Sequence, residues 1–228
     1  MIRGLSVLLS VVCCVIFVNC VMADEFTVGE KWVYQHAGSR SSGSIGQPVD
    51  GDRIREIVST TEEKGEQRWV LSEQWGTNDP VSSKMFICAE RLIHKVDAGA
   101  QMLAFKPPVK LDSMDLKPGE EKIFKSKITD KDNFYQFEWK VKGLSKETIK
   151  VPAGEFKDCT KVDATVTVSV PGAEGFNIVM KYRYWYHPDV NGFVKEEFRF
   201  SPPGQDPKNT KTFKGVSTLK SYTVGKKK

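Results

Sequence analysis

The chain has 228 residues and a formal net charge of +5, from 34 basic and 29 acidic side chains. Arg3 lies in the N-terminal segment, and Lys226, Lys227 and Lys228 supply three more positive charges at the end of the chain. The remainder is nearly neutral and has no basic stripe of the kind that binds nucleic acid, so we expect no nucleic-acid partner.

The first 23 residues have the order of a secretory signal sequence. Arg3 precedes an apolar run from Leu5 to Val18, and the segment ends in Val21-Met22-Ala23, with small residues on both sides of Met22. After Arg3 the next charged residue is Asp24, so cleavage is expected before Asp24. We predict a signal peptide over residues 1–23, a single β-rich domain over 24–225 and a basic tail over 226–228.

This signal predicts export to the periplasm or the extracellular space, with no integral membrane segment after cleavage. Two alternatives keep the protein on a membrane. The stretch from Leu5 to Met22 reaches the lower edge of membrane-spanning length, so an uncleaved signal would act as an anchor. A lipid on Cys20 would also anchor the chain, although Asn19 stands where lipoprotein signals have Gly, Ala or Ser.

Two cysteines remain once the signal is removed, Cys88 and Cys159. In an oxidising compartment they can form a disulfide. The alternative is two buried thiols that pack as small hydrophobic side chains. The pair has no Cys-x-x-Cys spacing, so the sequence gives no support for redox catalysis or a thiolate zinc site.

Most of the chain after the signal alternates between apolar and polar residues. The runs 135–141, 162–170 and 178–186 place aromatic or aliphatic side chains at every second position. This period of two predicts antiparallel strands with one buried and one wet face. Turn residues such as Lys64-Gly65 and Asn191-Gly192 separate the strands.

The predicted fold is therefore all-β, an antiparallel meander of about ten to twelve strands. Its apolar face has to be covered by the sheet itself, as a curved half-barrel, a barrel or a sandwich. Ser83 to Val96 is ambiguous because its apolar residues also share a helical face, so one short helix is an alternative there. We favour two short strands.

Six side chains are predicted to share one interior face because each lies on the apolar parity of its strand. This face is either a packed core or a pocket for a ligand, and the sequence leaves both open. The six residues are Phe137, Trp139, Val166, Val168, Tyr184 and Tyr186.

The sequence contains no motif for a catalytic, metal or cofactor site, and we expect no enzyme activity and no cofactor. For His36, His94 and His187 a surface or turn position is favoured over metal ligation, since they are widely separated. Glu196 and Glu197 are adjacent in a predicted strand and point to opposite faces, so they cannot work together as acid and base.

Three segments carry a resemblance to a known family: Phe26-Thr-Val-Gly-Glu-Lys-Trp-Val-Tyr34, Val151-Pro-Ala-Gly-Glu-Phe156 with Cys159, and Tyr184-Trp-Tyr-His-Pro-Asp-Val-Asn-Gly-Phe-Val-Lys195. With Lys106-Pro-Pro108 and Leu116-Lys-Pro-Gly119 they resemble the TapB-like exported bacterial proteins of unknown function. Those proteins are related in architecture to the LolA and LolB lipoprotein-carrier half-barrels. The resemblance implies a curved sheet whose concave apolar face receives acyl chains in the carriers.

The function predicted from the sequence is therefore non-catalytic binding in the cell envelope. The curved sheet would bind a lipid or other apolar ligand, or an envelope protein. A structural or adhesive surface domain with a filled core is the first alternative, and an enzyme with a dispersed site is the second.

Overall fold

The computed structural model describes residues 26–41, 48–76, 83–97, 102–110, 116–130, 133–169, 171–172, 177–201 and 212–225. The predicted signal peptide, Cys20 and the lysine tail lie outside these residues. The described residues form twelve strands and two 3₁₀ turns: β1 (Lys31–Gly38), β2 (Gly51–Glu63), β3 (Glu66–Trp75), β4 (Ser83–Cys88), η1 (Ala89–Arg91), β5 (Leu92–Asp97), β6 (Met102–Lys110), β7 (Glu121–Asp130), β8 (Asn133–Val151), β9 (Gly154–Ser169), β10 (Asn177–His187), η2 (Pro188–Val190), β11 (Gly192–Ser201) and β12 (Phe213–Thr223).

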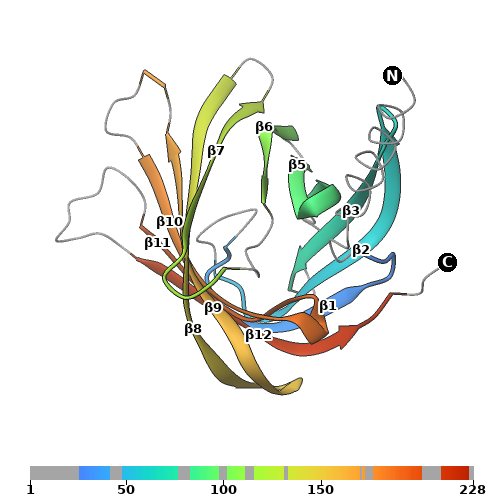
Figure 1. The fold of residues 1–228 in the computed structure, drawn as a ribbon, viewed down its shortest axis with the longest axis vertical. Coiled ribbons are helices and arrows are strands. Elements are labelled where there is room, and N and C mark those ends of the chain that lie inside the picture. Colours follow the sequence, from blue (N-terminus) through green and yellow to red (C-terminus); the bar gives the residue numbers. More distant parts are fainter. Residues whose placement is uncertain are drawn as a thin grey trace, which may run out of the picture.

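The twelve strands form one closed antiparallel barrel (Figure 1). Each strand pairs with its neighbours in sequence, and β1 pairs with both β2 and β12, which closes the sheet. In Figure 1, β8 to β12 occupy the left and lower parts of the barrel, and β2 and β3 lie on the right. The all-β meander is therefore confirmed, and of the three arrangements that the sequence left open the chain adopts the barrel.

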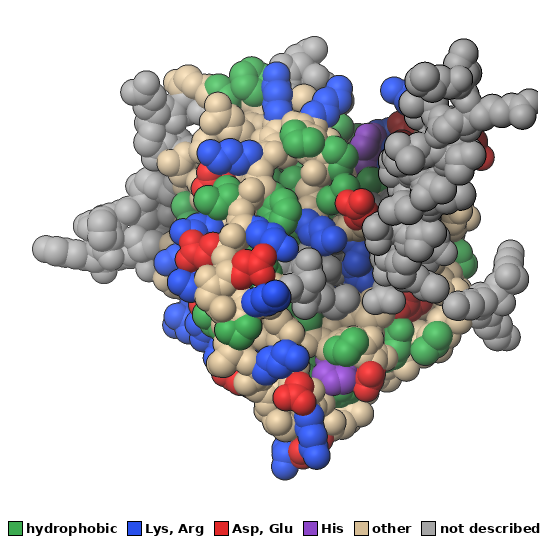
Figure 2. Space-filling model, viewed as in Figure 1, with side chains coloured by type: hydrophobic (Ala, Val, Ile, Leu, Met, Phe, Trp, Pro, Cys, Tyr) green, Lys and Arg blue, Asp and Glu red, His purple; other side chains and the backbone are tan. Residues whose placement is uncertain are grey.

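The predicted alternation places apolar side chains inside the barrel and charged ones outside. On β8, Trp139 and Val141 are buried, whereas Lys140 and Lys142 lie on the outer face. Both lysines pair with Glu121 of β7, at 3.1 and 3.0 Å. Figure 2 shows that the outer face carries many charged side chains of both signs with small hydrophobic areas between them. The inward parity thus supplies the core, as a one-faced sheet requires.

The turns follow the sequence signals. Lys64 and Gly65 both have positive φ and connect β2 to β3 as a two-residue hairpin loop. The ambiguous segment from Ser83 to Val96 forms β4 and β5 with η1 between them, so the favoured interpretation of two short strands is confirmed.

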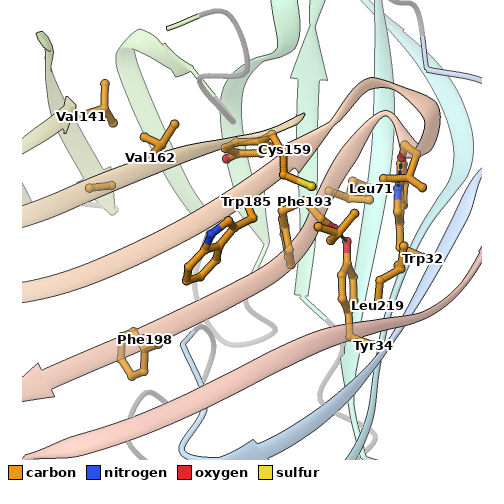
Figure 3. Close-up of a cluster of buried hydrophobic side chains, with 14 of the residues drawn as sticks. Trp32, Tyr34, Leu71, Val141, Cys159, Val162, Trp185, Phe193, Phe198 and Leu219 are labelled. Atoms are coloured by element: carbon orange, nitrogen blue, oxygen red, sulfur yellow. Dashed lines mark hydrogen bonds between the residues drawn. The ribbon is translucent and has the colours of Figure 1, made fainter. Parts of the chain in front are cut away.

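Side-chain hydrogen bonds to the main chain fix the core where β1 meets η2 and β11. The Trp32 indole donates from Nε1 to the carbonyl of Val190 at 2.6 Å, and the Tyr34 hydroxyl donates to that of Phe193 at 3.1 Å. Figure 3 shows Trp32, Tyr34 and Phe193 in the same cluster of buried side chains. These contacts join residues about 160 positions apart in the chain, so they form only when the barrel closes.

Gly215 of β12 allows a close approach between strands. A Cβ at this position would lie 2.2 Å from the Ser39 carbonyl oxygen and 2.9 Å from Cε1 of His36. We predict that Gly215→Ala lowers the free energy of unfolding by about 1–3 kcal/mol, because backbone and a buried ring would have to move. Urea denaturation of the purified protein measures it.

Val216→Ala, one residue further on and 39% exposed, is the matched control for that measurement. It should change stability little, since its side chain lies on the outer face. Equal stability of Gly215→Ala and the wild type would contradict the close approach.

Candidate functional site

The interior of the barrel contains a cavity of about 600 Å³. Aliphatic and aromatic side chains from β3 to β10 form most of its wall. All six residues of the predicted interior face line it: Phe137 and Trp139 of β8, Val166 and Val168 of β9, and Tyr184 and Tyr186 of β10. The interior therefore combines a packed core with a pocket.

One wall of the cavity is apolar and comes from β6 to β10. Phe137 is paired in register with Val168, and Trp139 with Val166. The Phe137 ring also meets the ring of Phe105 from β6 edge to face, with centroids 5.4 Å apart. Edge-to-face and cross-strand contacts of this kind hold the rings in fixed positions, so the wall is preformed.

Three tyrosines of β10 follow one another along the cavity. The rings of Tyr182 and Tyr184 stack with centroids 5.5 Å apart, and Tyr184 and Tyr186 lie 5.6 Å apart. Tyr182 donates its hydroxyl hydrogen to the Ser41 carbonyl at 3.0 Å. Burial raises the pKa of Tyr182 and Tyr184 above the ordinary value, so both hydroxyls are neutral donors.

The opposite wall carries a buried ionic cluster that the sequence analysis did not find. Arg53 of β2 donates from Nε and Nη2 to Oε1 of Glu73 on β3, at 2.9 and 2.7 Å. It also donates from Nη1 to Oε1 of Glu196 on β11, at 2.8 Å. The three residues are 4%, 0% and 3% exposed, respectively. All three line the cavity, and we call them the ionic triad.

Arg53 is charged in this setting. Burial by itself would lower its pKa, but the carboxylates of Glu196 and Glu73 raise the pKa above the ordinary value. Its guanidinium also lies over the Trp75 ring, 4.4 Å from the centroid, where the cation is attracted by the ring face. A buried cation with two carboxylates and an aromatic face has the partners that burial of charge demands.

Arg55 lines the cavity next to the triad. It is paired in register with Glu73, and its Nε lies 3.7 Å from Glu73 Oε1, which is too long for a hydrogen bond. Its guanidinium lies 5.3 Å from the Phe193 ring centroid. Arg55 Nε is buried without a hydrogen-bond partner among the described residues.

A second polar group borders the cavity at η1 and η2. Arg91 donates to the side chain and the carbonyl of Asn191, and its guanidinium lies 4.2 Å from the centroid of the Phe26 ring. The Asn191 amide in turn donates to Oε1 of Glu30 at 3.0 Å, and Glu30 is buried. Arg91 and Glu30 thus form a pair of opposite charges linked by one amide.

The predicted position of His36 is wrong. The sequence favours a surface or turn position for His36, whereas the residue is 2% exposed on the inward parity of β1. Its Nδ1 lies 2.9 Å from the Ser217 hydroxyl, and Nε2 has no partner among the described residues. Neither residue lines the cavity, so this Ser–His contact does not face it.

His94 and His187 lie elsewhere on the barrel. His94 is half-buried on β5, and His187 caps turn η2 by accepting a hydrogen bond from the Asp189 amide. His187 therefore has a turn position, which is one of the two that the sequence favoured. The three histidines come from separate parts of the barrel.

Cys88 and Cys159 are both free thiols in the structure. Cys88 Sγ donates to the Leu92 carbonyl at 3.3 Å and Cys159 Sγ to that of Phe156 at 3.4 Å. Burial raises the pKa of Cys159 to about 11, which disfavours the thiolate. In the structure Cys159 is buried, Cys88 is partly buried, and no disulfide joins them.

The sequence contains only a partial signal for the ionic triad. Arg53 stands in a strand where both parities carry polar residues, so it could equally face solvent. The alternation did separate Glu196 from Glu197, and the structure places the first inside and the second on the outer face. Parity along β3, where Trp69, Leu71 and Trp75 are buried, indicates that Glu73 points inward. Parity along β11, where Val194 and Phe198 are buried, indicates the same for Glu196.

Comparisons with known proteins find a likeness in fold. No family model and no curated protein matches the chain. A crystal structure of a protein from Bacteroides fragilis, described as exported and as having a YmcC-like fold, superposes with a TM-score of 0.51 at 14% identity, over 87% of this chain and 97% of that one. A protein from Parabacteroides distasonis, described as a lipoprotein, reaches 0.43 at 14% identity, over 88% and 100%. The first likeness shows that this chain shares the YmcC-like fold.

Two further findings concern the described residues alone. They contain no group of three His, Cys, Asp or Glu side chains placed to hold a metal ion. None of their helices combines the length and the apolar character needed to cross a membrane.

Burial of His36 predicts a loss of stability in acid. Burial, and then the charge of Arg53, lowers the pKa of His36 from 6.5 to about 4 in the folded state. The unfolded chain therefore takes up the proton first as pH falls below 6.5. Stability from this group is complete above that pH and is lost between 6.5 and 4, on the order of 3 kcal/mol in all.

Urea denaturation at a series of pH values measures this loss. His36→Gln should make the fall between pH 6.5 and 4 shallower, because the replacement does not titrate. A smaller slope should remain, since burial also lowers the pKa of His94. Identical slopes in the variant and the wild type would refute the assignment.

Proposed function

We propose that this protein is exported and binds an apolar ligand inside its barrel without acting as an enzyme. The observation that carries the proposal is the cavity of about 600 Å³ with its largely aliphatic and aromatic wall. Sites for small molecules have volumes of roughly 300–1,000 Å³ and are mostly apolar with a few polar groups. The cavity has both properties.

The cavity favours binding over a structural or adhesive role with a filled core. A core selected only for stability is packed to the density of an organic crystal, because each void costs dispersion contacts. Here Phe137, Val168 and Tyr184 are only partly buried although their side chains point inward. Leaving such groups uncovered inside a barrel is costly unless a ligand covers them.

Export is supported by the N-terminal sequence, with its basic residue, apolar run and small residues before Asp24. The Bacteroides fragilis protein of the same fold is also described as exported. A periplasmic or extracellular location fits both. The resemblance to TapB-like proteins, and through them to the LolA and LolB carriers, suggests acyl chains as the ligand class.

Filling the cavity tests the proposal. Val168→Trp adds a large side chain to the apolar wall and should weaken uptake of the neutral fluorescent probe N-phenylnaphthylamine by at least about tenfold, since the site is blocked. Because the new ring enters empty space, the variant should stay folded, which its circular dichroism checks. Fluorescence titration of the purified mature protein gives the affinity.

Thr167→Trp is the matched control, because Thr167 is the next residue of β9 and lies on the outward parity. It should bind the probe like the wild type. No probe uptake by the wild type, or equal uptake by both variants, would contradict binding in the cavity.

A further inference from the structure

The charged wall of the cavity has polar groups that the protein itself leaves without partners. The ionic triad uses all three nitrogens of Arg53, and Nη1 also donates to the Ser217 hydroxyl at 3.3 Å. Both hydrogen bonds to Glu196, from Arg53 and from the Ser41 hydroxyl at 2.9 Å, end on Oε1. No described residue donates to Oε2. One carboxylate oxygen on the cavity wall is therefore available as an acceptor.

Two donors lie beside this acceptor. Tyr184 is paired in register with Glu196, and its hydroxyl makes no hydrogen bond with another described residue. The Phe193 ring lies 5.9 Å from the Tyr184 ring and 5.3 Å from the Arg55 guanidinium, so it brings the second donor to the same region. The side chain of Arg55 is 11% exposed, and its Nε has no hydrogen-bond partner among the described residues.

The charges of this region add to zero. Arg53 and Arg55 contribute two positive charges, and Glu73 and Glu196 contribute two negative ones. An anion or a cation added here would leave one uncompensated charge in a dry interior, which is costly. A neutral group that accepts hydrogen bonds and donates one satisfies the free donors and the free acceptor without that cost.

The other charged side chains on the cavity wall do not change this balance. Arg91 is linked through Asn191 to Glu30, a second pair of opposite charges. Lys110 is the last residue of β6 and is half-exposed, so solvent screens its charge.

From these contacts we infer that the ligand is a neutral amphiphile. Its apolar chain or ring system packs against the wall formed by β6 to β10, and its hydroxyl or amide head binds Arg55, Tyr184 and Glu196. The inference rests on the proposed function, because it names the ligand class of the same cavity.

The test compares ligands that share one chain and differ in the head. Dodecanol, lauric acid, dodecylamine and dodecane each displace N-phenylnaphthylamine from the purified mature protein at neutral pH. Dodecanol should bind more tightly than either charged compound by about tenfold or more. Equal or tighter binding of lauric acid or dodecylamine overturns the inference.

Variants then assign the head to its residues. Tyr184→Phe removes one donor and should weaken dodecanol about fivefold, the worth of a single hydrogen bond. It should leave dodecane unchanged, since the ring is kept. An unchanged affinity for dodecanol, or an equal loss for both compounds, places the head elsewhere.

Charge variants reverse the preference if the balance argument holds. Arg55→Gln leaves one excess negative charge and should favour dodecylamine over lauric acid. Glu196→Gln leaves one excess positive charge and should favour lauric acid. Because Glu196→Gln can disturb the triad, Arg55→Gln alone suffices: no gain in relative affinity for dodecylamine contradicts the argument.

Different results would contradict binding in the cavity and the preference for a neutral polar head. If neither the probe nor any dodecyl compound binds, the proposed function is wrong. If the probe and dodecane bind but the head makes no difference, binding in the cavity stands and the neutral polar head is refuted.

Discussion

Arg53 joins three strands from inside the barrel, and the arrangement of the interior depends on it. Its guanidinium connects β2 to Glu73 on the next strand and to Glu196 on β11, 143 positions away in the chain. Removing one member of a buried ion pair leaves an uncompensated charge, at a cost of about 3–5 kcal/mol. Any strand register in which these three side chains do not meet would leave a buried charge unpaired. The triad therefore favours the one register in which the sheet closes.

The triad also explains why the interior is not filled by apolar side chains. A barrel of about eight strands is just wide enough for inward side chains to fill, and twelve strands enclose more space. Several inward positions that could have held bulky apolar groups hold Arg53, Arg55, Glu73 and Glu196 instead. These charges are held against β1 to β3 and β11 by their partners, so the space before the apolar wall remains open.

A cavity with one apolar and one polar wall favours one orientation of a bound amphiphile. Apolar burial supplies affinity in proportion to area and is insensitive to orientation. The few buried polar groups fix the orientation, because an unmade hydrogen bond in a dry site costs more than a made one gains. The Tyr182–Tyr184–Tyr186 row connects the two walls, since its rings continue the apolar surface and its hydroxyls can meet the polar one.

The sequence by itself determined the strands and their faces where the alternation was clean. Along Tyr135–Val141 and Val162–Val168 the side-chain period of two left one assignment, and the structure follows it. Two-residue turn signals such as Lys64-Gly65 fixed the neighbouring hairpins, because only certain residues accept positive φ. Local rules sufficed for these features.

Tertiary structure alone decided the closed barrel, the buried position of His36 and the ionic triad. In β2 both parities carry polar residues, so the alternation cannot say whether Arg53 points inward or outward. Only the closed sheet brings Glu196 to Arg53 and Ser217 to His36, across 143 and 181 positions of chain. A charge can be buried at low cost in free energy only when its partner is present. No local pattern encodes a partner 143 or 181 positions away in the chain.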